Sequence, residues 1–556
     1  MDEKFPFTLA DAAKKLCALD LTDTRRRDLL SSINAVAALL RRNPSELPAD
    51  IAELRKRLAP IHHVQAGVSP KRLANIKADV GAALRAVLCG DIAPAPKVQR
   101  IPEWAQMIDG LERPWQRHIL ARFTDNCSSK GVSPADVTDE TLAQFRSSLV
   151  DGSLAKSPDK TLKRIAQTWN GVVKRIGLPF RLLTVPRAPR YLAIPLSEFP
   201  ASFQVDAEAY FIRLTKIDIF AEDGPKKALR PTSVRNVKAS IRQFASALVA
   251  RGRKIEVITS LGSLVEFEAF KEGLRFFLDR NGGKPPTWLW GMAGALLSIA
   301  RYHVKLPEPA ITNLATIRGR LKLDTDRVTE KNRRRLAQFD DLYNVELLLL
   351  LPSRLTEGVL KGKPESSRVA LDVMHAVAIE ILLACPMRMN NLAALDIERH
   401  FMWHGVGNHQ TVSLYVPATE TKNGVAIEVD FHRETTAIIR LYLKSHRALV
   451  STTSCDWLFP LATGGGHRGP DHLSQELKDA IWRETGLEMN GHLFRHLAGK
   501  LFLERRPGRH ETVRQFLRHK KSDTTTTFYT GLDSKRASQH YYDVVLADRR
   551  QTGRKS

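Results

Sequence analysis

Residues 369–395 read VALDVMHAVAIEILLACPMRMNNLAAL, and this stretch decides how the last third of the chain folds. Drawn as a helix, residues 369–383 are apolar on nearly all sides, which is typical of a helix that is buried all round. The Cys385-Pro386 step predicts the end of this helix, because proline disfavours helical backbone in the residue before it. We therefore expect a buried central helix, with the polar segment around Arg388 at its exit.

Two strands are predicted after this helix. Residues 411–416 (TVSLYV) and 426–430 (AIEVD) are rich in β-branched side chains, and they flank a polar segment that contains Lys422. The pair Asn423-Gly424 in that segment is a strong signal for a hairpin turn. Helical patterns then resume. The last third of the chain is therefore expected to be α+β, with mostly helices and a small antiparallel sheet.

Most of the first 330 residues carry apolar side chains at helical spacing. Proline-containing breaks divide them at residues 91–102, 186–200 and 307–332. The fold class is thus mainly α and multi-domain, with the α+β part at the end. The predicted domains are 1–100, a helical extension; 101–200, a helical module; 201–332, a second helical module; and 333–556, the α+β domain with a C-terminal tail.

A weak internal repeat links two of these segments. Three residues have the same spacing in each, and the pattern reads as a helix, a short turn, and a threonine at the N-cap of the next helix. The two sets are Phe123, Gly131 and Thr138, and Phe244, Gly252 and Thr259. Residues 29–58 are a candidate third copy. Chance similarity between short helical hairpins is the alternative explanation.

The net charge points to a polyanionic partner. The 556 residues include 85 Lys and Arg against 60 Asp and Glu, a formal charge of +25, and nucleic acid is the commonest partner of such a chain. The alternative is a merely basic surface or a ribosome-associated protein. With 43% hydrophobic and 26% charged residues, the composition excludes wholesale disorder and fibrous repeats.

Membrane and metal-dependent classes are not expected. No apolar run approaches the roughly 18 residues that a membrane span needs, and the first residues lack a signal-peptide core. The five cysteines are scattered without C-x-x-C spacing, so we expect a reduced, cytoplasmic protein with no disulfide framework and no zinc knuckle. These cysteines are Cys17, Cys89, Cys127, Cys385 and Cys455.

Four short stretches of the last third contain candidate functional residues, at 386–395, 421–424, 492–496 and 517–529. Each has a structural explanation when it is taken alone. A single arginine such as Arg388 most often forms a salt bridge, and Lys422 is ordinary in a polar hairpin. His492 and Arg495 share one helix face, where they could simply be solvated. Tyr529 could pack in an amphipathic core.

Taken together and in order, these residues resemble the catalytic domain of the tyrosine recombinases, the phage integrase family. The resemblance covers about residues 335–545. That family carries Arg, Lys, His-x-x-Arg, a late His or Trp, and Tyr. The matching residues are Arg388, Lys422, His492, Arg495, His519 and Tyr529, with His496 as the additional histidine and residues 457–460 (WLFP) as a further element of the family.

Three departures from the family pattern affect the last helix and the first arginine. Asn391 stands where an acidic residue is usual after the first arginine, and Arg518 stands where glycine is usual before the late histidine. The interval from His519 to Tyr529 is one residue longer than expected. Tyr541 and Tyr542 are therefore the alternative nucleophiles.

The resemblance implies cleavage and rejoining of DNA through a phosphotyrosine. Tyr529 would be the nucleophile, and Lys422 the general acid for the leaving 5′-hydroxyl. His492 would assist proton transfer, and His519 would form a hydrogen bond with the scissile phosphate. Two arginine forks suit this task, because a guanidinium pairs with the charged oxygens of a phosphodiester better than a lysine does. The phosphotyrosine conserves the bond energy, so no cofactor, ATP or metal is expected.

The same resemblance implies an assembly on double-stranded DNA. Residues 201–332 would be a helical core-binding domain, which a basic linker, Arg333-Arg334-Arg335, joins to the catalytic domain. These three arginines and His496 are candidate DNA contacts. Four copies would act together, and the tail from Gly531 would pack on a neighbouring copy or on its own domain. The protein would be nucleoid-associated, with companion recombinases or accessory proteins as further candidate partners.

Three functions are consistent with these residues. The first is a site-specific recombinase, an integrase or transposase of a mobile element, in which 101–200 would be a further DNA-binding repeat. The second is a type IB topoisomerase, which uses closely similar catalytic residues. The third is a catalytically decayed protein that only binds selected DNA sequences. The helical modules before residue 330 favour the first.

Overall fold

The computed structural model describes residues 7–89, 99–111, 113–152, 154, 157–177, 179–186, 193–216, 228–323, 329–360, 366–406, 410–451 and 453–518. They form two compact units, one within residues 187–326 and the other from the described residues of 1–186 and 327–556. Among the described helices, none has the length and apolar character needed to cross a membrane. The candidate residues His519, Tyr529, Tyr541 and Tyr542 and the tail lie outside the described residues.

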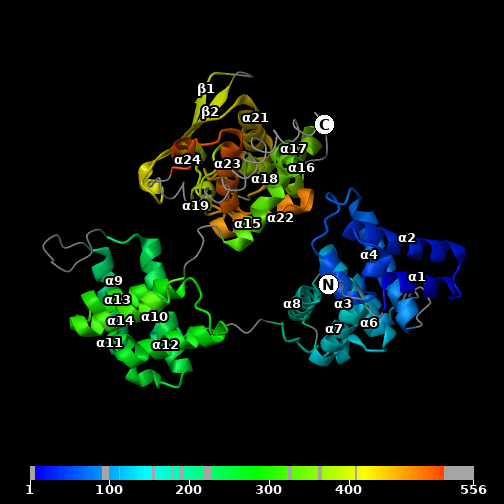
Figure 1. Ribbon diagram of the computed structural model, residues 1–556, viewed down its shortest axis with the longest axis horizontal. Coiled ribbons are helices and arrows are strands. Elements are labelled where there is room, and N and C mark those ends of the chain that lie inside the picture. The colour runs from blue at the N-terminus through cyan, green and yellow to red at the C-terminus, as the bar shows by residue number, and fades with distance from the viewer. Residues whose placement is uncertain are drawn as a thin grey trace, which may run out of the picture. The chain divides into compact units, whose positions relative to one another are not determined.

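Two helical cores lie in the first 186 residues (Figure 1). Leu16, Ile33 and Val80 belong to the first, and the second is built round Trp104 and Trp169, whose ring centroids are 5.7 Å apart. The helices of the first are α1 (Leu9–Cys17), α2 (Asp23–Leu40), η1 (Pro44–Glu46), α3 (Ile51–Leu58) and α4 (Pro70–Cys89). Those of the second are α5 (Pro102–Asp109), α6 (Pro114–Ser129), η2 (Pro134–Asp136), α7 (Asp139–Gly152) and α8 (Pro158–Ile176).

The unit within residues 187–326 is a helical bundle of its own. Phe203, Phe244 and Phe270 are fully buried at its centre. Asp206 links three helices of this bundle. Its carboxylate contacts His303 Nε2 at 2.7 Å and accepts a hydrogen bond from the amide of Leu261 at 2.7 Å. Its helices are η3 (Leu196–Glu198), α9 (Ala201–Thr215), α10 (Pro231–Ala250), η4 (Ile255–Val257), α11 (Gly262–Val265), α12 (Phe267–Arg280), α13 (Leu289–Tyr302) and α14 (Glu308–Arg320).

The turn anticipated by the internal repeat occurs three times, after α2, α6 and α10. In each copy one residue adopts a left-handed conformation, and the next amide bonds the carbonyl five residues earlier, at 2.9–3.1 Å, which is a Schellman cap. A 3-10 helix then starts three residues after the left-handed position. The left-handed residues are Arg41, Gly131 and Gly252. The candidate third copy thus has the same turn with an arginine in place of glycine.

The predicted threonine caps differ between the copies. Thr138 precedes α7 directly, and its hydroxyl accepts the amide of Thr141 at 3.4 Å, as expected for an N-cap. The prediction for Thr259 is wrong, because α11 starts only after Leu261 and has no side-chain cap. The amide of Leu261 is satisfied by Asp206 of another helix instead. The contact with Asp206 therefore takes the place of the local N-cap that the sequence predicted.

The third part, residues 329–518, has a core of its own and contains the sheet. Helix α18 contacts α17, α21, α22 and α23, so it lies at the centre of this core (Figure 1). The helices are α15 (Glu330–Ala337), η5 (Gln338–Asp340), α16 (Leu342–Leu349), α17 (Leu351–Leu360), α18 (Ser367–Ala384), α19 (Met389–Ala393), α20 (Ile397–His400), η7 (Ala418–Glu420), α21 (Arg433–Leu441), η8 (Tyr442–His446), η9 (Arg447–Leu449), α22 (Pro470–Thr485), α23 (Gly491–Arg505) and α24 (His510–Phe516).

The sheet has three antiparallel strands in the order β1-β2-β3: β1 (Phe401–His404), β2 (Thr411–Val416) and β3 (Ile427–Asp430). Leu414 of β2 faces Phe401 on one side and Val429 on the other. The sequence predicted the second and third strands and missed the first. The fold is therefore mainly α and multi-domain with a small antiparallel sheet, as expected, whereas the exact domain boundaries stay a prediction.

The basic run 333–335 forms no linker, contrary to the expectation. All three arginines lie within α15, whose Leu336 is buried in the core of this part. Arg335 pairs with Glu488 at 3.1 Å, and Arg333 and Arg334 are exposed. A single apolar contact explains this outcome, because the buried Leu336 anchors an otherwise polar and charged helix to the core.

The close packing of α10 against α12 generates a stability prediction. A Cβ on Gly273 would lie 2.4 Å from the buried ring of Phe244, whereas the space around Gly291 on α13 is open. We expect Gly273→Ala to destabilise this unit by about 1–3 kcal/mol through overpacking. Gly291→Ala should leave it unchanged or stabilise it by up to about 1 kcal/mol. Thermal unfolding of both variants checks this, and equal melting temperatures would contradict it.

Candidate active site

The candidate site is built at the exit of the central helix. Helix α18 ends at Ala384 with Cys385 as its C-cap, as the proline predicted, and Arg388 occupies the N-cap position of the short helix α19. The Arg388 guanidinium is half-buried, and this burial lowers its pKa. An arginine stays charged even so. A helix that is held on all sides therefore fixes the backbone from which Arg388 projects.

The second arginine is the most firmly held residue of the site. Arg495, on α23, is only 5% exposed. Its guanidinium donates one bond of 2.6 Å to the carbonyl of Pro386 and another to the carbonyl of Leu517. These carbonyls belong to the exit of α18 and to the C-cap of α24. Arg495 thus joins three segments that are far apart in the sequence.

His492 lies one helical turn before Arg495. A Cβ on the preceding Gly491 would lie 2.1 Å from the sulfur of Met389, so the start of α23 lies against α19 and Arg388. Although His492 is open to solvent, partial desolvation, then the charges of Arg495 and Arg388, lower its pKa below the ordinary 6.5. His492 is therefore neutral at pH 7.

His496 has a different setting from the one expected. Its side chain is buried, and its ring meets the edge of His492 with centroids 4.6 Å apart and planes at 87°. It contacts His492 from within the fold, and its role as a DNA contact stays a prediction.

Lys422 projects from a turn between β2 and β3. The amide of Gly424 bonds the carbonyl of Thr421 at 3.3 Å, which makes Lys422 the second residue of a four-residue turn. Gly424 has a left-handed backbone and Asn423 does not, so this is not the tight Asn-Gly hairpin turn that the sequence indicated. Lys422 itself is exposed, whereas Thr421 is 2% exposed.

One small pocket joins these elements. Arg388 and Arg495 line it together with residues of the Lys422 turn and of the C-cap of α24. The other lining residues are Met387, Asn391, Thr421, Asn423, Val425, Ile427, Leu517 and Arg518. The described chain ends at Arg518, directly before His519, at the wall of this pocket.

Arg518 shows why the family pattern has glycine at its position. Its backbone is left-handed, with φ of 54°, a conformation that glycine adopts without cost. The arginine offsets this cost with side-chain bonds to the carbonyl of Glu428 at 3.1 Å and to the sulfur of Cys385 at 3.6 Å. Its own carbonyl accepts the side-chain amide of Asn423 at 3.0 Å. The departure therefore reinforces the wall next to the Lys422 turn.

Asn391 explains the other departure. Its side-chain amide donates to the carbonyl of Glu420, 3.2 Å away, at the start of the Lys422 turn. An amide can donate this bond and a carboxylate cannot. Residues 457–460 lie behind the site, where the amide of Leu458 bonds the carbonyl of Leu395 at 2.8 Å. Sequence reasoning missed Glu420 as a participant, although its place two residues before Lys422 is a usable signal.

The donor set does not indicate a metal site. Within the described part of the chain, no group of three or more His, Cys, Asp or Glu side chains is arranged to hold a metal ion. The pocket presents cationic groups to its occupant, which suits an anion.

The chain is similar to one known protein family and to several solved structures. The model of the phage integrase family matches residues 363–536, and no curated protein matches the chain. Similar solved structures include a XerH site-specific recombinase bound to difH substrate in a pre-cleavage complex, with 12% identity over 76% of this chain and 95% of that chain and a TM-score of 0.33. XerA recombinase has 13% identity over 56% and 92%, with a TM-score of 0.24. The integrase from mycobacterium phage Brujita has 18% identity over 56% and 85%, with a TM-score of 0.21.

The matched residues include the whole described pocket, from Met387 to Arg518. Residues 363–536 therefore form a domain of the phage integrase family, the tyrosine recombinases.

Proposed function

We propose that the chain is a site-specific DNA recombinase, an integrase or transposase of a mobile element, that works through a 3′-phosphotyrosine. The observation that carries this proposal is the pocket in which Arg388, Arg495 and the Lys422 turn meet. Arg518, the residue directly before His519, also lines this pocket. Two guanidinium forks suit the non-bridging oxygens of one phosphate, and preorganised donors stabilise the charge that develops during attack.

The proposed cleavage step exchanges one phosphorus–oxygen bond for another. The phenolic oxygen of Tyr529 attacks the phosphorus, and the bond from phosphorus to the 5′-oxygen breaks. The neutral His492 accepts the phenolic proton, directly or through water, and Lys422 gives a proton to the leaving 5′-oxygen. His519 would bond the phosphate. Rejoining reverses these transfers, and no cofactor takes part.

DNA is proposed as the partner because of the charge of the chain and the family of its last domain. The exposed Arg333 and Arg334 of α15 are candidate phosphate contacts. The turn shared by α2, α6 and α10 supports the proposal that the N-terminal modules and the bundle at 193–323 are copies of one DNA-binding element. Four copies of the chain would assemble on two duplexes, with companion recombinases where the element encodes them.

The nucleophile is tested with a nicked suicide substrate in EDTA. The DNA covers the ends of the element that encodes the chain, and the proteins are wild type, Tyr529→Phe and the control Tyr541→Phe/Tyr542→Phe. We expect a covalent protein–DNA species with wild type and the control and none with Tyr529→Phe, on denaturing gels. An adduct with Tyr529→Phe would move the nucleophile to Tyr541 or Tyr542.

Two further outcomes would replace the proposed function. Binding to this DNA with no adduct from any variant would favour a decayed DNA-binding protein. Relaxation of supercoiled plasmid without any site requirement would favour the type IB topoisomerase.

The arginine forks are tested by substitution with lysine, which keeps the charge and loses the fork. We expect Arg388→Lys to lower the single-turnover cleavage rate by about 10²–10³-fold, the cost of one preorganised donor. The control is Arg368→Lys at the start of α18, where the arginine pairs with Asp372 on the surface. A loss below threefold for Arg388→Lys, with DNA affinity unchanged, would remove Arg388 from the site.

The pKa of His492 gives a pH prediction. Because its pKa is lowered, His492 stays neutral and able to accept a proton down to below pH 6.5, and cleavage should fall only when the pH drops through this pKa. Removing a neighbouring positive charge with Arg388→Gln favours the protonated form, so the pKa should rise. Histidine Cε1 NMR titration checks this, with the resonance assigned by His492→Gln. An unchanged or lower pKa in Arg388→Gln would contradict it.

A further inference from the structure

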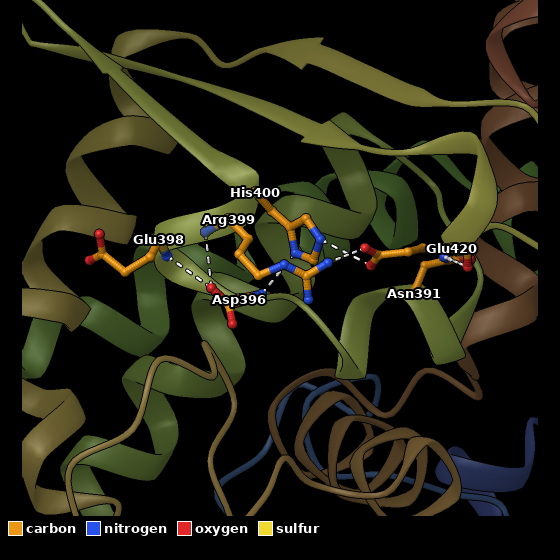
Figure 2. Close-up of polar contacts among 6 residues, drawn as sticks. All are labelled: Asn391, Asp396, Glu398, Arg399, His400 and Glu420. Atoms are coloured by element: carbon orange, nitrogen blue, oxygen red, sulfur yellow. Dashed lines mark hydrogen bonds and ion pairs between the residues drawn. The ribbon is translucent and has the colours of Figure 1, made fainter.

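Glu420 lies directly before the turn Thr421–Gly424 that carries Lys422, and three side chains contact it. Its carboxylate contacts the Nε2 of His400 at 3.1 Å and forms an ion pair with Arg399. Its backbone carbonyl accepts the amide of Asn391 at 3.2 Å. Figure 2 shows the His400 ring and the Arg399 guanidinium both directed at this carboxylate, with Asn391 on the far side. All three partners come from residues 391–400, the segment that follows Arg388.

The contact from His400 has a fixed direction. His400 is 1% exposed, and its Nδ1 accepts the backbone amide of Asp396 at 2.9 Å. Because an amide can only donate, Nδ1 carries no proton, and the ring proton lies on Nε2. Nε2 therefore donates to Glu420. The buried imidazole is neutral and has both nitrogens in use.

The other flank of the turn is also held. The hydroxyl of the buried Thr421 bonds the carbonyl of Ala418 at 3.1 Å and accepts the amide of Val425 at 3.1 Å. The side-chain amide of Asn423 donates to the carbonyl of Arg518 at 3.0 Å. Lys422 lies between these anchored residues and is exposed. Its backbone is thus fixed while its side chain can reach a phosphate.

We propose that His400, acting through Glu420, is a positioning residue for Lys422. The inference depends on the proposed role of Lys422 as the general acid. Ten residues, 417–426, separate β2 from β3, and a free loop of this length would sample many positions of the lysine. Glu420 does not act on Lys422 by its charge, because His400 and Arg399 occupy its carboxylate. The contact selects where the turn lies, and misplacement of a catalytic group by about 1 Å can cost 10²-fold in rate.

The test compares two leaving groups. A suicide substrate with sulfur in place of the bridging 5′-oxygen releases a thiolate, which needs no proton, so a defect in the general acid disappears with this substrate. For Lys422→Ala we expect a loss of about 10²-fold or more with the oxygen substrate and near wild-type cleavage with the sulfur substrate. For His400→Ala we expect a loss of about 10–100-fold with oxygen and a rate within threefold of wild type with sulfur.

Glu420→Ala distinguishes the proposed role from a folding defect. Its side chain is partly exposed whereas that of His400 is buried, so its removal disturbs the fold less. It should reproduce the pattern of His400→Ala, and the double variant should be no slower than either single one, since both changes break one contact. His400→Gln keeps a donor for Glu420 and should recover most of the rate. The matched control is His404→Ala, an exposed histidine of β1 that contacts Ser413 and not the turn. It should leave both rates unchanged.

Equal losses on both substrates for His400→Ala and Glu420→Ala would overturn the inference, since a merely structural role affects the two leaving groups alike. In that case rescue of Lys422→Ala by sulfur would leave the proposed function intact. If sulfur fails to rescue Lys422→Ala, the assignment of Lys422 as the general acid is wrong, and the role of His400 is wrong with it.

Discussion

The pair of bonds from Arg495 to the carbonyls of Pro386 and Leu517 is the contact on which the candidate site depends. A buried guanidinium costs free energy unless its N–H groups find acceptors, so the end of α18 and the C-cap of α24 must lie where they can supply them. Carbonyl oxygens orient the guanidinium without cancelling its charge. The same two bonds that join these segments therefore orient a cation toward the pocket.

Close packing and hydrogen bonds arrange the other parts of the site around this contact. Gly491 lets Met389 approach the start of α23, which brings the N-cap of α19 and its Arg388 beside His492. The amide of Asn391 and the left-handed backbone of Arg518 hold the Lys422 turn from two sides. Both residues differ from the family pattern, and each makes contacts that its usual counterpart could not make.

Much of this geometry could be anticipated from the sequence, because strong local signals were not opposed by tertiary contacts. The largely apolar run at 369–383 and the proline at 386 predicted α18 and its end correctly, and β-branched runs predicted β2 and β3. The strand at 401–404 (FMWH) was missed because, unlike β2 and β3, it contains no β-branched side chain. Tertiary contacts decided the remaining cases. Asp206 replaced the expected cap at Thr259, and a ten-residue loop replaced the tight turn that Asn423-Gly424 indicated. The roles of His519 and Tyr529 stay predictions.

The direction of the hydrogen bond from Asp396 to His400 has a consequence for proton movement. Relays through histidine need one ring nitrogen to take up a proton while the other releases one. The backbone amide of Asp396 donates its hydrogen bond to Nδ1, so this nitrogen cannot take up a proton. The ring of His400 therefore cannot pass a proton from one nitrogen to the other. The link from His400 through Glu420 to the turn can therefore transmit position and not charge. In the proposed mechanism, proton transfer at the pocket falls to side chains that solvent can reach, of which His492 and Lys422 are two.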